Sequence, residues 1–123
     1  MKPDHRGWRH LVNSTRYSLK GLRAAYRNET AFRQEVVLCV ILLPLAWWIG
    51  TTPLEWLLLI GSCVMVLIVE LLNSAIENVV DRIGTEHHEL SGRAKDISSA
   101  AVMLSLLVAG MTWLLLAWQR LWG

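Results

Sequence analysis

The stretch from residue 54 to residue 83 reads LEWLLLIGSCVMVLIVELLNSAIENVVDRI, and it is strongly apolar as far as Glu70. At a rise of about 1.5 Å per residue, a helix of this length measures about 45 Å, which exceeds the roughly 30 Å hydrocarbon core of a bilayer. We therefore expect a membrane-spanning helix with a protruding end, and Glu70 near the interface at that end. An ionisable group near hydrocarbon costs roughly 2.5–3.5 kcal/mol on insertion scales, so Glu70 is expected to have a partner or a task.

Glu70 shares one face of this predicted helix with other polar side chains. Asn73 and Glu77 follow it at i+3 and i+7, and Ser74 and Asp81 fall on the same stripe. Two carboxylates and a carboxamide that point in one direction can bind a divalent cation or activate a hydroxyl group. The spacing leaves one alternative open, in which Glu70 and Asn73 only form hydrogen bonds between subunits.

A second span is expected on the N-terminal side, over residues 31–50. It contains Pro44, which should kink the helix. The sequence Gly50-Thr51-Thr52-Pro53 follows as a turn signal, so this span and the next should lie side by side.

A third span is expected over residues 94–119. Its Ala101, Ser105 and Ala109 recur at every fourth position, a spacing that lets helix backbones approach closely. With three spans and 123 residues, the chain is predicted to be an all-α membrane protein with one domain over residues 1–123.

Residues 8–28 predict a helix on the membrane surface. An apolar stripe and a basic stripe follow helical spacing on neighbouring faces, which lets one face enter the interface while the cations reach lipid headgroups. The alternative is a soluble helix packed on a partner. Eight of the twelve Lys and Arg residues lie in the first 33 positions, and beside apolar spans this favours an anionic membrane surface over nucleic acid. The distribution of cations predicts a cytoplasmic N-terminus and a cytoplasmic second connector.

The sequence contains no common nucleotide-binding loop or kinase motif, so any phosphate chemistry must depend on scattered charged residues. Phosphoryl transfer needs mainly positioning and charge neutralisation. Carboxylates suited to a metal ion, cations suited to phosphates and one possible base are present: Glu29, Glu77 and Asp96; Lys95, Arg23 and Arg9; and Glu70. The two cysteines, Cys39 and Cys63, are interpreted as packing residues rather than as a disulfide or a metal site.

The run VELLNSAIENVVDRIGTEHHELSGRAKDISSAAV, residues 69–102, closely resembles the signature of the prokaryotic diacylglycerol kinases. The stretch YSLKGLRAAYRNETAFRQE, residues 17–35, is similar to the surface helix of that family and its entry to the first span. The resemblance implies a homotrimeric enzyme of the bacterial inner membrane. Such an enzyme uses ATP and Mg²⁺ to phosphorylate the free hydroxyl of diacylglycerol, which gives phosphatidic acid.

The resemblance also implies roles for individual residues. Glu70 matches the general base, Asn73 a polar residue beside it, and Glu29 and Glu77 the metal-binding carboxylates. Positions that match nucleotide contacts are His10, Tyr17, Glu29, Glu77, Glu86, His87, His88, Lys95 and Asp96. Positions that match the lipid cleft are Ser14, Leu19, Arg23, Ala31, Gln34, Glu35, Trp48, Trp56, Glu70, Ser99 and Trp113.

The chain departs from the family pattern at a few of these positions. Familiar members carry arginine at the place of His10, although Arg9 precedes it here, and tryptophan where Leu19 and Tyr26 stand. Position 87 is often tyrosine and is His87 in this chain.

Three other functions remain as alternatives. The first is a kinase of the same fold that acts on undecaprenol. The second is a small oligomeric transporter or proton path, in which the intramembrane glutamate Glu70 serves a translocated cation. The third is a structural membrane oligomer in which Glu70 holds subunits together. Lys95 and Asp96, beside a polar connector, favour the kinase.

Overall fold

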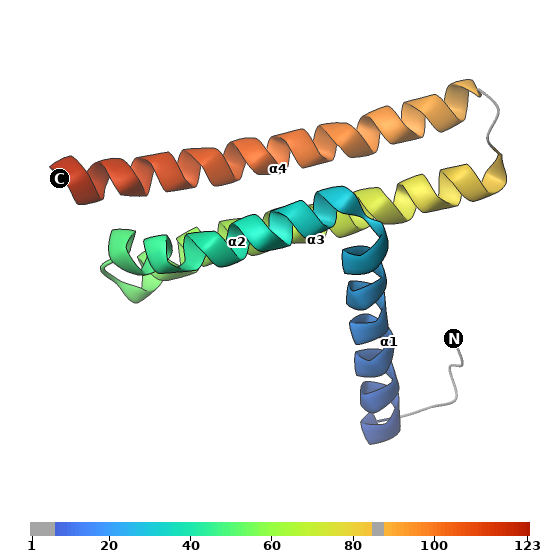
Figure 1. The fold of residues 1–123 in the computed structure, drawn as a ribbon, viewed down its shortest axis with the longest axis horizontal. Coiled ribbons are helices and arrows are strands. Elements are labelled where there is room, and N and C mark those ends of the chain that lie inside the picture. The colour runs from blue at the N-terminus through green and yellow to red at the C-terminus, as the bar shows by residue number, and fades with distance from the viewer. Residues whose placement is uncertain (1–6, 85–87) are drawn as a thin grey trace.

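The computed structural model describes residues 7–84 and 88–123, which form four helices. These are α1 (Gly7–Asn28), α2 (Thr30–Ile49), α3 (Pro53–Ile83) and α4 (Glu89–Trp122). The last three are long and apolar enough to cross a membrane, and they run alongside one another, whereas α1 leaves them at a steep angle (Figure 1). The described part of the chain is therefore all-helical, with three candidate membrane spans.

The helix bounds follow from local signals at each end. Thr52 caps α3 by accepting a hydrogen bond from the Glu55 N–H at 3.2 Å, with Pro53 in the first helical position. At its other end α3 stops at Ile83, the last residue of the stretch from residue 54 to residue 83, and Gly84 follows it as the cap.

Helix α4 begins at Glu89 rather than at residue 94, so residues 89–93 belong to the helix and not to the connector before it. His88 caps it, because its Nδ1 accepts a hydrogen bond from the Leu90 N–H at 3.1 Å. The first turn also carries an ion pair between Arg93 and Glu89 at 3.0 Å. A polar stretch can be helical outside the hydrocarbon, and here these contacts favour it.

The closest helix packing joins α3 to α4. The buried positions of α3 recur every three or four residues, which makes one continuous stripe: Leu59, Ser62, Val66, Glu70 and Ser74. On α4 the buried small residues are Ser98 and Ser105, whose hydroxyl groups donate to the carbonyl oxygens three residues earlier. Because these hydroxyls are satisfied within their own helix, the serines can pack in an apolar interface.

The ladder of Ala101, Ser105 and Ala109 predicts close packing within or between subunits, and only its central residue is buried within the chain. Ser105 is buried against its neighbours, but Ala101 is exposed and Ala109 is half-buried. The other buried serine of α4 is Ser98, seven residues before Ser105 and so near the same face of the helix.

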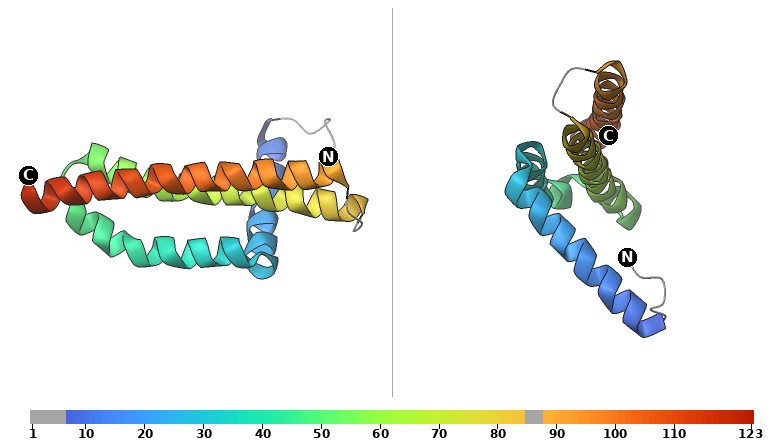
Figure 2. Two further views of the ribbon diagram at one scale, coloured as in Figure 1. Left: turned by 90° about the horizontal axis from the view of Figure 1, so that it is seen from above. Right: turned by 90° about the vertical axis from the view of Figure 1, so that its right-hand side faces the viewer.

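Helices α2, α3 and α4 meet at one end of the molecule, and α2 separates from the other two toward the opposite end (Figure 2). A buried cluster of Ala46, Ile49, Leu59 and Leu116 joins α2, α3 and α4 near the connector between α2 and α3. Helix α2 continues through Pro44, bends toward this end, and lies apart from α4 at its other end (Figure 2). Cys39 and Cys63 are both half-buried, on α2 and α3.

Candidate active site

Glu70 lies on the buried face of α3, with only 5% of its surface exposed. Two other carboxylates act on it electrostatically: Glu35 from the start of α2, and Glu77 from α3 itself. Glu77 stands two helical turns beyond Glu70, about 10 Å along the axis at the usual helical rise. The helices thus gather three acidic side chains at the end of the bundle where α2 separates from α3 and α4.

An apolar cavity of about 280 Å³ opens beside this acidic group, between α2, α3 and α4. Glu35 and Trp113 both line this cavity, so two of the predicted lipid-contacting residues share it. Val66, one turn before Glu70, also lines it. An alkyl chain in this cavity would lie next to the turn of α3 that carries the buried carboxylate.

Asn73 adds an unpaired polar atom to the same face. Its Oδ1 is buried and has no hydrogen-bond partner within the described residues. Buried acceptors are nearly always satisfied in folded proteins, so this oxygen is suited to a donor that the isolated chain does not supply.

Lys95 and Asp81 form an ion pair across α3 and α4, with Nζ and Oδ1 at 2.8 Å. Both side chains are partly exposed, and Lys95 also experiences the charge of Glu77. Asp81 therefore holds the cation of Lys95 near the predicted metal-binding carboxylate of Glu77. The next residue, Asp96, is exposed.

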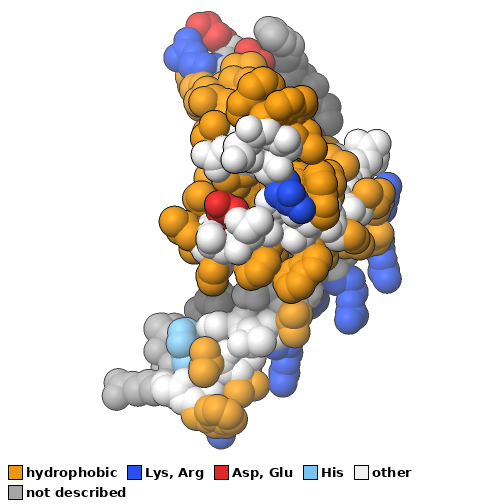
Figure 3. Space-filling view, turned by 90° about the vertical axis from the view of Figure 1, so that its left-hand side faces the viewer, with side chains coloured by type: hydrophobic (Ala, Val, Ile, Leu, Met, Phe, Trp, Pro, Cys, Tyr) orange, Lys and Arg blue, Asp and Glu red, His pale blue; other side chains and the backbone are white. Residues whose placement is uncertain are grey.

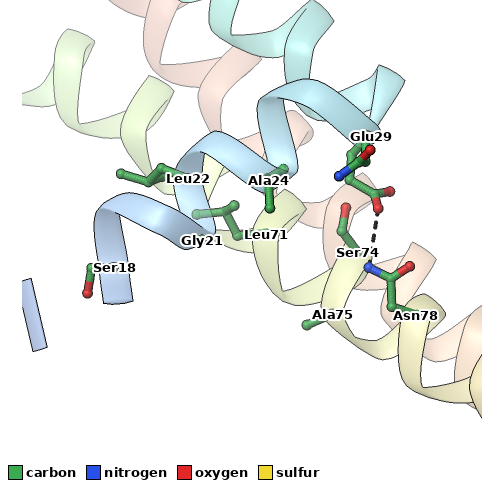
Figure 4. A pocket seen from close by; sticks show the side chains of 11 residues that line it. Ser18, Gly21, Leu22, Ala24, Glu29, Leu71, Ser74, Ala75 and Asn78 are labelled. Carbon is green, nitrogen blue, oxygen red and sulfur yellow. Dashed lines mark hydrogen bonds between the residues drawn. The ribbon is translucent and has the colours of Figure 1, made fainter. Parts of the chain in front are cut away.

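Glu29 is the single non-helical residue between α1 and α2, and its backbone is extended. Arg33 stabilises this junction by donating from Nη1 to the carbonyl oxygen of Tyr26 at 2.8 Å. The Glu29 carboxylate points toward α3, where it accepts a hydrogen bond from Asn78 at 3.2 Å (Figure 4). Because Asn78 follows Glu77 directly, the fold brings Glu29 to the turn of α3 that carries the second predicted metal ligand.

A second cavity, of about 670 Å³, lies between α1 and α3 next to this hydrogen bond. Small residues line it from both helices, among them Gly21 and Ala24 on α1 and Ser74 and Ala75 on α3 (Figure 4). The small side chains leave room at the junction.

The residues around Glu29 and Glu77 fit a magnesium ion, although the described residues contain no group of three or more His, Cys, Asp or Glu side chains placed to hold a metal. Mg²⁺ prefers oxygen ligands and is usually bound by one or two carboxylates together with substrate phosphates. Glu29 and Glu77 supply such carboxylates, and a nucleotide would supply the phosphates. Their role as ligands remains a prediction.

Several predicted nucleotide and lipid contacts lie on α1, away from the acidic group. His10, Ser14, Tyr17 and Leu19 belong to the part of α1 that projects from the three long helices (Figure 1). Figure 3 shows Lys and Arg side chains along one side of the molecule's lower part, where α1 lies. Within one chain these residues do not complete the site of Lys95 and Glu77.

The remaining predicted contacts are spread over both ends of the bundle. Arg23 lies on α1, while Ala31 and Gln34 lie in the first turns of α2, and Ser99 is exposed on α4. His88 is the cap of α4, whereas Glu86 and His87 lie outside the described residues. Trp48 and Trp56 lie at the opposite end of the spans from Glu70, since 14 residues of helix, about 21 Å, separate Trp56 from it.

Two polar partners in this region are not among the predicted site residues. Asn78 binds Glu29, and Asp81 binds Lys95. The position of Asn78 could have been predicted from helical spacing. Leu71, Ser74 and Asn78 recur at i, i+3 and i+7, and they form the face of α3 that meets α1. No local pattern indicates which cation Asp81 would bind.

The fold and the site together define an integral membrane protein with a buried carboxylate, neighbouring acidic groups and a lysine at one end of three spans. Comparison with known proteins identifies the family. A model of the family described as prokaryotic diacylglycerol kinase matches residues 16–117. The chain therefore belongs to the prokaryotic diacylglycerol kinase family, and it is a lipid kinase.

Similar proteins include three that are named diacylglycerol kinase. The one from Haemophilus influenzae is 57% identical over 107 residues, which cover 87% of this chain and 91% of the relative. The one from Escherichia coli K12 is 53% identical over 114 residues, 93% of each chain, and the one from Pseudomonas aeruginosa is 50% identical over 107 residues, 87% of each. Membership of a kinase family decides against the transporter and the purely structural oligomer.

Proposed function

We propose that this chain transfers the γ-phosphoryl group of ATP to the free hydroxyl of diacylglycerol and so forms phosphatidic acid. The observation that carries the proposal is the buried carboxylate of Glu70 next to an apolar cavity that reaches Trp113. This arrangement matches a lipid alcohol, whose alkyl chains would occupy the apolar cavity and whose hydroxyl group would meet the carboxylate. The names of the relatives support diacylglycerol as that alcohol.

The reaction requires one proton to leave the lipid hydroxyl as its oxygen attacks the γ-phosphorus. The new P–O bond forms to the lipid oxygen, the P–O bond to the ADP oxygen breaks, and Glu70 accepts the proton. The lipid hydroxyl has a single proton, which it donates to Glu70. Glu70 therefore orients the nucleophile, and the Asn73 Oδ1, which is unpaired within the described residues, is left for a different donor.

The phosphate groups would lie beyond Glu70, toward Glu77 and Lys95. Lys95 supplies positive charge, and Asp81 holds the lysine in place at 2.8 Å. Glu29 and Glu77 would hold Mg²⁺, with Asn78 orienting the Glu29 carboxylate at 3.2 Å. When bound, the ion neutralises phosphate charge that builds up in the transition state.

The complete site is proposed to form between subunits of a homotrimer. Two features support this arrangement: α1 carries His10 and Tyr17 away from its own α3 and α4, and the spans leave many large apolar side chains exposed. The basic N-terminal region supports a cytoplasmic N-terminus at the bacterial inner membrane, with the site on the ATP-containing side.

The test uses the full-length chain, purified and returned to lipid vesicles. It is incubated with radiolabelled ATP and Mg²⁺ and with either diacylglycerol or undecaprenol, and labelled lipid is then separated. Labelled phosphatidic acid in the first arm is expected. Label in undecaprenyl phosphate alone would replace the proposed substrate, and no labelled lipid in either arm would overturn the proposal.

A matched pair of variants locates the chemistry. Glu70→Gln should remove product formation, while Glu89→Gln changes an exposed carboxylate on α4 that has no proposed role in the reaction and should keep it. Equal loss in both variants would indicate general damage to the protein. Unchanged turnover in Glu70→Gln would show that another group accepts the proton.

A further inference from the structure

A third cavity lies at the end of the bundle opposite Glu70. It has a volume of about 500 Å³ and is formed where the connector between α2 and α3 meets the C-terminal end of α4. The charged side chains in its lining are the carboxylate of Glu55 and the guanidinium of Arg120. Figure 3 views the molecule from this end and shows acidic and basic side chains close together among hydrophobic ones.

Both charged groups are held in position by contacts with neighbouring residues. The Glu55 Oε1 accepts hydrogen bonds from the Thr51 N–H at 2.9 Å and from the Thr51 hydroxyl at 3.0 Å. Arg120 donates from Nε to the carbonyl oxygen of Trp48 at 3.0 Å, and its guanidinium lies 4.7 Å from the centre of that indole ring. The ion pairs in the described part of the chain join other residues, so Glu55 and Arg120 face one cavity with opposite charges that do not neutralise each other directly.

The aromatic residues around the cavity indicate its depth in a membrane. Trp47 stacks on Trp56 with 4.9 Å between the ring centres, and Trp118 stacks on Trp122 with 4.7 Å between them. All four side chains lie at this end of the helices. Tryptophan is enriched at the level of lipid headgroups. The two charges therefore lie where headgroups are, and not in the hydrocarbon.

We propose that this cavity binds the headgroup of a phospholipid that carries both a phosphate and a primary ammonium group, as in phosphatidylethanolamine. Arg120 binds the phosphate through its Nη atoms, because Nε is already engaged with Trp48. Glu55 accepts hydrogen bonds from the ammonium, which has three N–H donors. A quaternary ammonium has no N–H group, so phosphatidylcholine should bind less well although its net charge is the same.

The proposal does not depend on the proposed kinase reaction. Glu55 and Glu70 are 15 residues apart on α3, about 22 Å at the usual helical rise, so the two sites lie near opposite surfaces of the membrane. A lipid in this cavity would connect α4 to the turn between α2 and α3, and its expected effect is on stability and lipid retention.

The experiment measures lipid binding to the full chain after removal of bound lipid in detergent. Native mass spectrometry follows titrations with phosphatidylethanolamine, phosphatidylcholine and phosphatidylglycerol of identical acyl chains. Phosphatidylethanolamine should bind about tenfold more tightly than phosphatidylcholine, since one charge-assisted hydrogen bond accounts for a difference of that size. Equal binding of these two lipids, or tightest binding of phosphatidylglycerol, would overturn the proposal.

Variants connect the preference to the cavity. Glu55→Gln keeps an oxygen for the Thr51 hydrogen bonds, so it should fold, and it should abolish the preference for phosphatidylethanolamine. Arg120→Gln should weaken binding of every phospholipid tested. The matched controls are Glu89→Gln and Arg93→Gln at the other end of α4, which should leave the preference intact. A preference that survives Glu55→Gln, or is lost equally in the controls, refutes this assignment.

Discussion

Replacement of Glu70 by glutamine tests whether its carboxylate acts in chemistry or only in assembly. Glutamine has nearly the same shape, so the buried position of Glu70, with 5% of its surface exposed, stays filled. Loss of a general base typically lowers the rate by about 10²- to 10⁴-fold, or roughly 2.7 to 5.5 kcal/mol in activation free energy. We expect a fall in kcat of that size.

The same substitution should not destabilise the protein. Glu77 stands about 10 Å from Glu70 along the helix axis, and at an effective dielectric constant of about 20 two such charges repel by about 1.6 kcal/mol. Glu35 adds repulsion of the same sign. Removal of the Glu70 charge therefore relieves repulsion, and the melting temperature should stay the same or rise.

The assay combines steady-state turnover in lipid vesicles with thermal unfolding in detergent and with measurement of oligomer size. The expected combination is a large loss of kcat with unchanged assembly and unreduced melting temperature. A variant that unfolds at lower temperature or dissociates, and whose remaining oligomer still turns over normally, would show that Glu70 serves assembly. That outcome would refute the catalytic role.

Three further substitutions test other parts of the structure. Glu77→Gln should raise the Mg²⁺ concentration needed for half-maximal activity, and an unchanged magnesium titration would argue against Glu77 as a ligand. Gly50→Ala should lower the unfolding free energy by about 1–3 kcal/mol, measured by thermal unfolding, because a Cβ would lie 2.7 Å from Nε1 of Trp56 in a closely packed turn. Asp81→Asn should change stability by less than about 1 kcal/mol, since its ion pair is partly exposed, but it should raise the KM for ATP by releasing Lys95. A KM equal to that of the unchanged protein would show that this ion pair does not position the lysine.

Much of the fold could be predicted from the chain alone. The length and composition of the apolar stretches predict three spans, and Gly84 predicts the end of α3 at Ile83. These features are local, because hydropathy and helical rise depend on consecutive residues. The start of α4 was harder to predict, since the contacts of His88 and Arg93 make a polar segment helical.

The same local reasoning places Glu70, Asn73 and Glu77 on one face, because helical periodicity relates residues on a single helix. Helical periodicity does not predict contacts between residues on different helices. The hydrogen bond of Asn78 to Glu29 depends on how the junction before α2 turns, and the pairing of Lys95 with Asp81 depends on the relative shift of α3 and α4.

Sequence by itself therefore determined the number of spans, their approximate ends and the acidic stripe of α3. Tertiary structure alone decided that Ser98 and Ser105, and not Ala101, pack against α3, and that Glu55 and Arg120 face one cavity. The physical reason is that the rotation of each helix about its axis and its crossing with the next are set by the packing of side chains far apart in the chain.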